Sequence, residues 1–108
     1  PTYAADLANA ILDIIQNKAF KGVGQKTKIY HYLNEGEISW YDFAQEVFKL
    51  AKIDCKVNPI TTQQYPTPAK RPKNTLMNKD KIVEIFSLVI SDWVVSLQDC
   101  IKNIEGKQ

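Results

Sequence analysis

The sequence has few of the side chains that most often carry metal or nucleophile chemistry. It contains one histidine, His31, and two cysteines, Cys55 and Cys100, that have no His or Cys neighbour at metal-ligand spacing. We therefore expect no metal site and two free thiols, buried or half-buried, in a reducing compartment. No nucleophile can be tied to His31 by spacing, which favours a structural role for this histidine over a hydrolase triad. Glu35 and Glu37 are expected to be solvated turn residues rather than an acid/base pair.

Long apolar runs, glycine-rich loops and an excess of one charge are also missing. No run approaches the ~20 apolar residues of a membrane span, and no basic segment leads into an apolar stretch at the N-terminus, so we expect a cytoplasmic protein with no membrane partner. The four glycines, Gly22, Gly24, Gly36 and Gly106, do not follow the dinucleotide-binding pattern. The 14 basic and 12 acidic residues are spread along the chain, which argues against nucleic acid as a partner and makes any anion site local.

Helical spacing of apolar side chains predicts four helices. The first begins at Asp6, whose carboxylate is placed to accept hydrogen bonds from the first turn, and ends near Asn17. Ser39 is expected to cap the second helix, Asn78 the third and Ser91 the fourth. Trp40 and Trp93 are expected to be core residues rather than parts of a cofactor site. The predicted buried stripes of the second and fourth helices are Trp40, Phe43, Ala44, Val47, Leu50 and Ala51, and Trp93, Val94, Leu97, Cys100, Ile101 and Ile104.

Two segments rich in β-forming residues, 28–34 and 55–61, predict short strands. The helix between them and the short return imply a parallel pair with a right-handed crossover. The predicted fold class is therefore α/β, with a short parallel sheet of two to three strands and about four helices in one domain over residues 1–108. Residues 20–28, which contain glycines and lysines, predict an exposed connection. Two strands are few for a free-standing parallel sheet, which normally has more strands and cover on both faces, so we expect part of the fold to be missing from this unit.

The stretch TTQQYPTPAKRPKNTLM has no helix or strand period and holds three of the five prolines. It also holds the only arginine of the chain, Arg71, between two lysines. Proline fixes φ and keeps the preceding residue extended, so Tyr65, Thr67 and Arg71 are expected outside the helical region. A loop ordered in this way loses less entropy on binding, and a guanidinium matches the paired oxygens of a phosphate or diphosphate. The alternative is a solvated basic surface loop without a ligand.

Four stretches of the sequence carry a family resemblance: PTYAADLANAIL, YHYLNEGEISWYDFAQEVFKLA, NPITTQQYPTPAKRPKNTLMNKDKI and DWVVSLQDCI. In this order they resemble the C-terminal part of the dTDP-4-dehydrorhamnose reductase family, within the extended short-chain dehydrogenase/reductase superfamily. The resemblance runs from Pro1 to about Ile104, and YPTPAKRPKNT is its most specific piece. The stretch SLVISDW departs from the family, in which glycine and proline are expected near Ser87 and Ser91.

Members of this family join an N-terminal Rossmann half, which binds NAD(P)H and holds a Tyr-x-x-x-Lys pair, to a C-terminal half that closes over the sugar nucleotide. The resemblance implies that this chain is the substrate-binding fragment, with no catalytic residue, no bound cofactor and no activity of its own. The parent would use NADPH or NADH to reduce the 4-keto group of dTDP-4-dehydro-L-rhamnose to give dTDP-L-rhamnose. The implied partners are the dTDP-sugar and the missing half, and a homodimer is allowed. The alternative is a non-catalytic or regulatory relative, similar to the β subunit of methionine adenosyltransferase.

Nucleotide-sugar epimerases of the same superfamily resemble the proline-rich loop in one further pattern. An alanine and two basic residues are followed by an acidic or amide residue, and then by a helix that bears a lysine. The pattern falls on Ala69, Lys70, Arg71 and Asn74, with Lys79 or Lys81 in the next helix. By this similarity Arg71 contacts the substrate diphosphate. The substrate-binding residues that we predict are Tyr65, Lys70, Arg71, Lys73 and Asn74.

Overall fold

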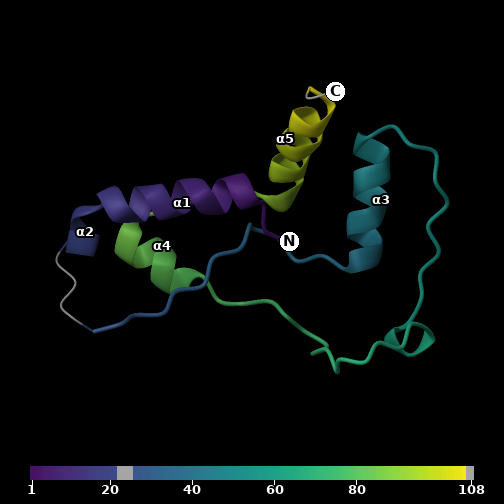
Figure 1. Ribbon diagram of the computed structural model, residues 1–108, viewed down its shortest axis with the longest axis horizontal. Helices are drawn as coiled ribbons and strands as arrows, with labels where there is room; N and C mark the ends of the chain where they lie inside the picture. Colours follow the sequence, from purple (N-terminus) through teal and green to yellow (C-terminus); the bar gives the residue numbers. More distant parts are fainter. Residues whose placement is uncertain (22–25, 107–108) are drawn as a thin grey trace. The chain divides into compact units, whose positions relative to one another are not determined.

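The computed structural model describes residues 1–21 and 26–106, and the chain divides into two compact units (Figure 1). Unit 1 consists of Pro1–Gly36 and Met77–Gln108, and unit 2 of Glu37–Leu76. Unit 2 holds the proline-rich loop, and unit 1 holds most of the helical residues. The single substrate-binding domain over residues 1–108 stays a prediction.

The described residues of unit 1 form four helices: α1 (Ala4–Gln16), α2 (Lys18–Lys21), α4 (Asp80–Phe86) and α5 (Trp93–Glu105). The helix end predicted near Asn17 is confirmed. The Asn17 side chain accepts a hydrogen bond from the Ala19 amide at 2.9 Å, and it donates one to the Phe86 carbonyl at 3.0 Å. One amide side chain thus joins α1, α2 and the end of α4. The exposed connection predicted over residues 20–28 lies partly outside the described residues.

The core of unit 1 is small. It consists of Ala10 from α1, Ile82 and Phe86 from α4, and Leu88 from the segment that follows α4. The ring of Tyr30 meets Phe86 edge to face, with 5.2 Å between the ring centroids. Because so few side chains are buried, the opposite face of α1 remains open to solvent. Its large apolar residues are between 37% and 55% exposed: Leu7, Ile11, Leu12 and Ile15.

Two of the predicted helix caps in unit 1 are wrong. The residue before α1 is Tyr3, which forms no side-chain cap, and the Asp6 carboxylate turns instead toward a buried asparagine of another segment. Before α5 the cap is Asp92 rather than Ser91, because the Asp92 carboxylate accepts a hydrogen bond from the Val94 amide at 2.8 Å. For α1 a tertiary contact with Asn34 takes the Asp6 side chain away from the helix end, whereas α5 simply begins one residue later than predicted.

Of the other two predicted caps, Ser39 is confirmed, whereas Asn78 lies one residue before the N-cap of its helix. In unit 2 the Ser39 hydroxyl accepts a hydrogen bond from the Asp42 amide at 3.1 Å, at the start of α3 (Trp40–Leu50). In unit 1 the N-cap of α4 is Lys79 rather than Asn78, although the side-chain oxygen of Asn78 accepts a hydrogen bond from the Asp80 amide at 2.8 Å. Both hydrogen bonds satisfy an amide of the first helical turn that has no partner inside the helix.

The predicted two-stranded sheet is not formed by the described residues, which contain helices and a single isolated bridge. That bridge is parallel and joins Glu35 to Asp92 within unit 1. The Glu35 amide donates to the Ser91 carbonyl at 2.9 Å, and the Trp93 amide donates to the Glu35 carbonyl at 3.0 Å. The segments 28–34 and 55–61 have no regular structure where strands were predicted, because neither has a neighbouring strand to satisfy its backbone groups.

The predicted apolar stripes are only partly correct. No residue of α3 is buried, because unit 2 has no second α-helix or sheet that could cover its apolar face. Trp40, expected in the core, is 85% exposed. In α5 the stripe residues are half-buried except Ile104, which is 59% exposed, and the one fully buried residue is Ser96. Periodicity thus identified the apolar faces but not how far each is covered.

Candidate functional site

The proline-rich loop of unit 2 is ordered by local hydrogen bonds. It opens with a 3₁₀ turn, η1 (Thr62–Gln64), in which the Thr61 amide donates to the Gln64 side chain at 2.7 Å. Further along, the Thr67 hydroxyl donates to the Ala69 carbonyl at 3.0 Å, and the Asn74 side chain accepts from the Leu76 amide at 2.8 Å. These bonds add to the φ restraint of the prolines and hold the loop in a non-helical path.

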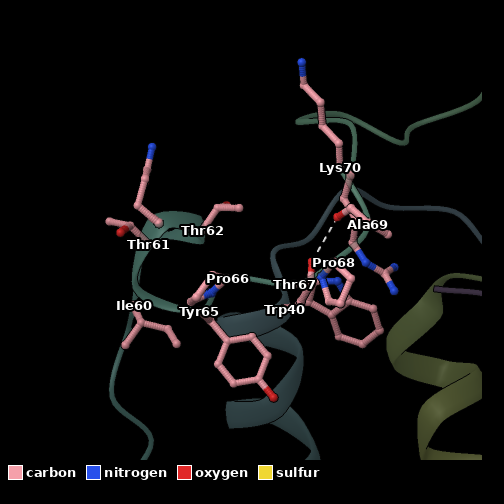
Figure 2. A pocket seen from close by; sticks show the side chains of 12 residues that line it. Trp40, Ile60, Thr61, Thr62, Tyr65, Pro66, Thr67, Pro68, Ala69 and Lys70 are labelled. Atoms are coloured by element: carbon pink, nitrogen blue, oxygen red, sulfur yellow. Dashed lines mark hydrogen bonds between the residues drawn. The ribbon is translucent and has the colours of Figure 1, made fainter.

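The loop and the first residue of α3 line a groove of about 840 Å³ (Figure 2). This volume lies within the usual range of small-molecule sites, roughly 300 to 1,000 Å³. Three of the five predicted binding residues, Tyr65, Lys70 and Arg71, line the groove, whereas Lys73 and Asn74 do not. The other lining residues are Trp40, Ile60, Thr61, Thr62, Gln63, Pro66, Thr67, Pro68 and Ala69.

The groove combines apolar walls with two cations. Tyr65 is 69% exposed and Ile60 is 60% exposed, so both present apolar surface to the groove. Neither Lys70 nor Arg71 forms an ion pair or a side-chain hydrogen bond with another described residue. Figure 2 shows the Lys70 side chain extending away from the rings of Trp40 and Tyr65. The arrangement suits a ligand that carries both an anionic and an apolar group.

Sequence reasoning missed Trp40, which was assigned to the core of the second predicted helix. The structure places its ring in the groove and in edge-to-face contact with Phe43, with 6.0 Å between the centroids. Trp40 follows the Ser39 cap directly and therefore lies at the end of the helix, where apolar periodicity does not distinguish a core position from an exposed one. Its place next to the cap was the available signal.

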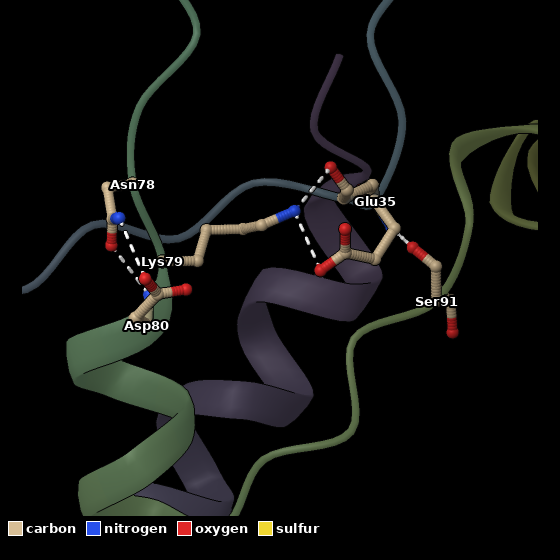
Figure 3. Close-up of polar contacts among 6 residues, drawn as sticks. Glu35, Asn78, Lys79, Asp80 and Ser91 are labelled. Carbon is tan, nitrogen blue, oxygen red and sulfur yellow. Dashed lines mark hydrogen bonds and ion pairs between the residues drawn. The ribbon is translucent and has the colours of Figure 1, made fainter.

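The two lysines suggested by the epimerase pattern have partners inside unit 1. The Lys79 ammonium lies 2.8 Å from a Glu35 carboxylate oxygen and 3.3 Å from the Asn34 carbonyl oxygen, and its side chain is only 13% exposed (Figure 3). The Lys81 ammonium donates to the Ile29 carbonyl at 2.8 Å. Both lysines tie α4 to the segment that precedes unit 2. Glu35, which was expected to be solvated, is half of an ion pair.

A second polar cluster surrounds Asn34, which is 1% exposed in unit 1. The side-chain nitrogen of Asn34 donates to Asp6 at 2.6 Å and to the Ser96 hydroxyl at 2.9 Å. Its side-chain oxygen accepts from the Tyr3 backbone amide at 2.8 Å. The Ser96 hydroxyl also donates to the same oxygen of Asp6. Because every one of these groups has a partner, the cluster is a structural network that links α1 and α5.

The histidine and the cysteines contribute no site. His31 is exposed, so the expectation that it is packed or structurally satisfied is wrong. Both thiols are free, as predicted, but Cys55 is exposed and only Cys100 is half-buried. Among the described residues there is no group of three or more His, Cys, Asp or Glu side chains that could hold a metal ion. In the same part of the chain, none of the helices has the length and apolar character to cross a membrane.

The comparisons with known proteins agree on one family. The family model described as the RmlD substrate binding domain matches residues 1–105. The dTDP-4-dehydrorhamnose reductase of Aggregatibacter actinomycetemcomitans is 40% identical, with 98% of this chain and 36% of the relative covered. The reductase of Shigella flexneri that bears the same name is 36% identical, with 91% and 34% covered.

A solved structure gives the same result. The crystal structure of a dTDP-4-dehydrorhamnose reductase from Clostridium acetobutylicum superimposes with a TM-score of 0.82 at 37% sequence identity. The match covers 97% of this chain and 35% of the other. The chain thus spans about a third of the length of the relatives that it matches.

Proposed function

Because the chain belongs to the RmlD substrate binding domain family, we propose that it is the sugar-nucleotide-binding part of a longer dTDP-4-dehydrorhamnose reductase. The parent enzyme would transfer a hydride from NADPH or NADH to the 4-keto group of dTDP-4-dehydro-L-rhamnose and release dTDP-L-rhamnose, in the cytoplasm. The proposal is supported by relatives that are named dTDP-4-dehydrorhamnose reductase. This chain covers about a third of their length. The cofactor site and the Tyr-x-x-x-Lys pair would belong to a Rossmann half outside this sequence, and a homodimer fits the same scheme.

The missing sheet is part of this proposal. The segments 28–34 and 55–61 are rich in β-forming residues but have no regular structure in this chain. Their unpaired backbone groups would be satisfied by strands of the Rossmann half, so a short parallel sheet would form only in the parent protein. A 108-residue chain without that half would have no reductase activity when given NADPH and the 4-keto sugar nucleotide.

Arg71 would bind the diphosphate of the sugar nucleotide. The observation that carries this role is that Arg71 lines the groove without a partner among the described residues, inside the most specific part of the family resemblance. Its planar fork of donors can pair with two phosphate oxygens at once, and the proline that follows it limits the backbone conformations of the loop. Tyr65 and Lys70 would assist from the same groove. Lys73 and Asn74 would need the rest of the parent protein to reach the ligand.

Calorimetric titration of dTDP-rhamnose into variants of the parent reductase tests this role. Charge-assisted bonds to a phosphate contribute about 1.5 to 3 kcal/mol, so Arg71→Ala should weaken binding roughly ten- to a hundredfold. Arg71→Lys keeps the charge but loses the fork of donors, so its affinity for dTDP-rhamnose should lie between those of the unsubstituted reductase and Arg71→Ala. Cofactor affinity should be unchanged. Lys56→Ala is the matched control, because Lys56 is an exposed lysine of unit 2 that does not line the groove.

The outcomes separate the proposed site from a solvated loop. If the loop has no ligand, Arg71→Ala, Lys70→Ala and Lys73→Ala will all have equally small effects on dTDP-rhamnose affinity. An Arg71→Ala reductase that binds as tightly as the parent removes Arg71 from the site. Loss of cofactor affinity in the same variant would show that the substitution disturbs the whole protein.

A further inference from the structure

Trp40 is the residue of the groove that the family resemblance and the diphosphate role leave unexplained. Its side chain is 85% exposed, although tryptophan is among the residues that gain most from burial. It does not stand alone on the surface, because it lines the same groove as Tyr65, Ile60 and Arg71. The groove therefore has one wall that is aromatic and apolar, next to a guanidinium without a described partner.

The indole packs against a second aromatic ring. Trp40 is the first residue of α3, directly after the Ser39 cap, and its ring meets Phe43 edge to face at an interplanar angle of 90°. An edge contact of this kind uses the rim of one ring and leaves a flat face of the other available. Figure 2 shows the labelled Trp40 ring on the side of the groove where Pro68 lies, away from the Lys70 ammonium. The groove thus has an exposed π surface.

We infer that Trp40 is the stacking platform for the nucleobase of the nucleoside diphosphate sugar that this groove takes. The inference rests on the proposed function, because it uses the diphosphate role of Arg71 to orient the ligand. With the diphosphate at the guanidinium, the neighbouring aromatic wall receives the flat, apolar end of the nucleotide. Stacking on an aromatic ring tolerates any base, so Trp40 contributes affinity, and selection among bases is left to hydrogen bonds elsewhere.

Charge and polarity favour this occupant over an apolar peptide. The two described residues that line the groove and carry a charge at neutral pH, Lys70 and Arg71, are both cations, and no carboxylate is among the lining residues. A purely apolar partner would bury these cations without a counter-charge, which costs free energy. A nucleoside diphosphate supplies the counter-charge and the planar ring in a single molecule. The remaining alternative is that another part of the parent protein covers Trp40.

Three ligands distinguish the base contact of Trp40 from the diphosphate contact of Arg71 in the parent reductase. Their affinities can be measured by NMR titration, which covers weak and tight binding alike. dTDP carries base and diphosphate, inorganic pyrophosphate carries only the anion, and thymidine carries only the base. Removal of a stacking ring costs roughly five- to 150-fold in affinity. Trp40→Ala should therefore lower the affinity for dTDP and for thymidine by that factor and leave the affinity for pyrophosphate unchanged. Trp40→Phe keeps a ring and should retain most of the affinity.

Arg71→Ala is the complementary variant. It should lower the affinity for dTDP and for pyrophosphate but not the affinity for thymidine. A Trp40→Ala reductase that binds dTDP normally, while Arg71→Ala does not, overturns the stacking inference and leaves the proposed function intact. If neither variant loses dTDP affinity, the groove is not the nucleotide site and both ideas fail. A lower melting temperature of Trp40→Ala with unchanged thymidine affinity shows that Trp40 is covered by protein, which also overturns the inference.

Fluorescence gives a second measurement that does not require Trp40→Ala to fold well. Stacking of a base on the indole should quench Trp40 emission when dTDP is added. The part of the quenching that comes from Trp40 is the difference between the parent reductase and Trp40→Phe. Pyrophosphate, which has no base, should produce no such difference. Equal quenching of the two proteins by dTDP contradicts the inference.

Discussion

The side-chain amide of Asn34 donates a hydrogen bond to the Asp6 carboxylate at 2.6 Å, across 28 positions of the sequence. The same amide reaches Ser96 of α5, so one buried residue connects the two longest helices of unit 1. The Asn34 side chain is buried and the Asp6 carboxylate half-buried, so water can replace these hydrogen bonds only in part. The stability of unit 1 should therefore depend on this asparagine.

Asn34→Ala should lower the free energy of unfolding by about 1 to 3 kcal/mol, because it leaves the Tyr3 amide without its partner and removes one of the two side-chain donors to Asp6, the other being the Ser96 hydroxyl. Urea denaturation of the chain measures the loss. The matched control is Asn103→Ala, since the Asn103 amide donates to the Tyr3 hydroxyl and to Asp99 at exposed positions. That substitution should cost less than about 0.5 kcal/mol. Equal losses for the two variants would contradict the importance of the buried network.

Ser87 ends α4 with a left-handed backbone, at φ 53° and ψ 38°. An L-residue in this region costs about 1 to 2 kcal/mol, whereas glycine adopts it freely at some cost in unfolded-state entropy. Ser87→Gly should therefore raise the free energy of unfolding by about 1 kcal/mol, measured by thermal or urea denaturation. Ser87→Ala keeps the Cβ atom and should bring no gain. A stabilisation that is the same for both variants would show that the hydroxyl, rather than the backbone, is responsible.

Local features were predicted well from the sequence. The Ser39 cap was found because cap and helix are neighbours in the chain, and the loop around Arg71 was found because prolines act on the residues beside them. The cap assigned to Asp6 was wrong because its partner, Asn34, is distant in sequence. The prediction that Trp40 is a core residue was wrong because its exposure depends on a second layer of structure, which unit 2 lacks. The segment 28–34 has the residues of a strand, but a strand also requires a neighbour that this sequence does not provide.

Tyr32 gives unit 1 a dependence on alkaline pH. Burial, together with the negative charge of Asp6, raises the pKa of the Tyr32 phenol above its ordinary value of 10.0. The folded state therefore keeps this proton more tightly than the unfolded state does. Its contribution to stability is complete below pH 10 and is lost as the pH rises through the higher pKa of the folded protein.

Urea denaturation of the chain between pH 9 and pH 12 measures this effect. The free energy of unfolding should fall with pH more steeply in the unsubstituted chain than in Tyr32→Phe, which has no phenol at this position to ionise. The comparison removes the contributions of the lysines and the other tyrosines, since both proteins share them. Identical slopes in the two proteins would show that Tyr32 ionises equally easily in the folded and unfolded states.

The exposed apolar face of α1 should make the 108-residue chain associate with itself. Ile11, Leu12 and Ile15 are each about half exposed, at 48%, 55% and 51%, on one amphipathic helix. Neighbouring apolar side chains of this size form a patch of the kind that single-chain proteins normally cover. In the proposed parent, the Rossmann half is the natural cover, and without it a second copy of the chain can take its place.

Sedimentation equilibrium over a range of concentrations tests this prediction. Ile11→Glu and Ile15→Glu place a charge in the centre of the face and should shift the chain toward the monomer, because a carboxylate buried between two copies would lose its water without gaining a partner. Val89→Glu is the matched control: Val89 is 97% exposed and lies in the segment after α4, so a charge there should leave association unchanged. A chain that remains monomeric at millimolar concentration, or an α1 variant that associates as strongly as the parent, would show that this face needs no partner.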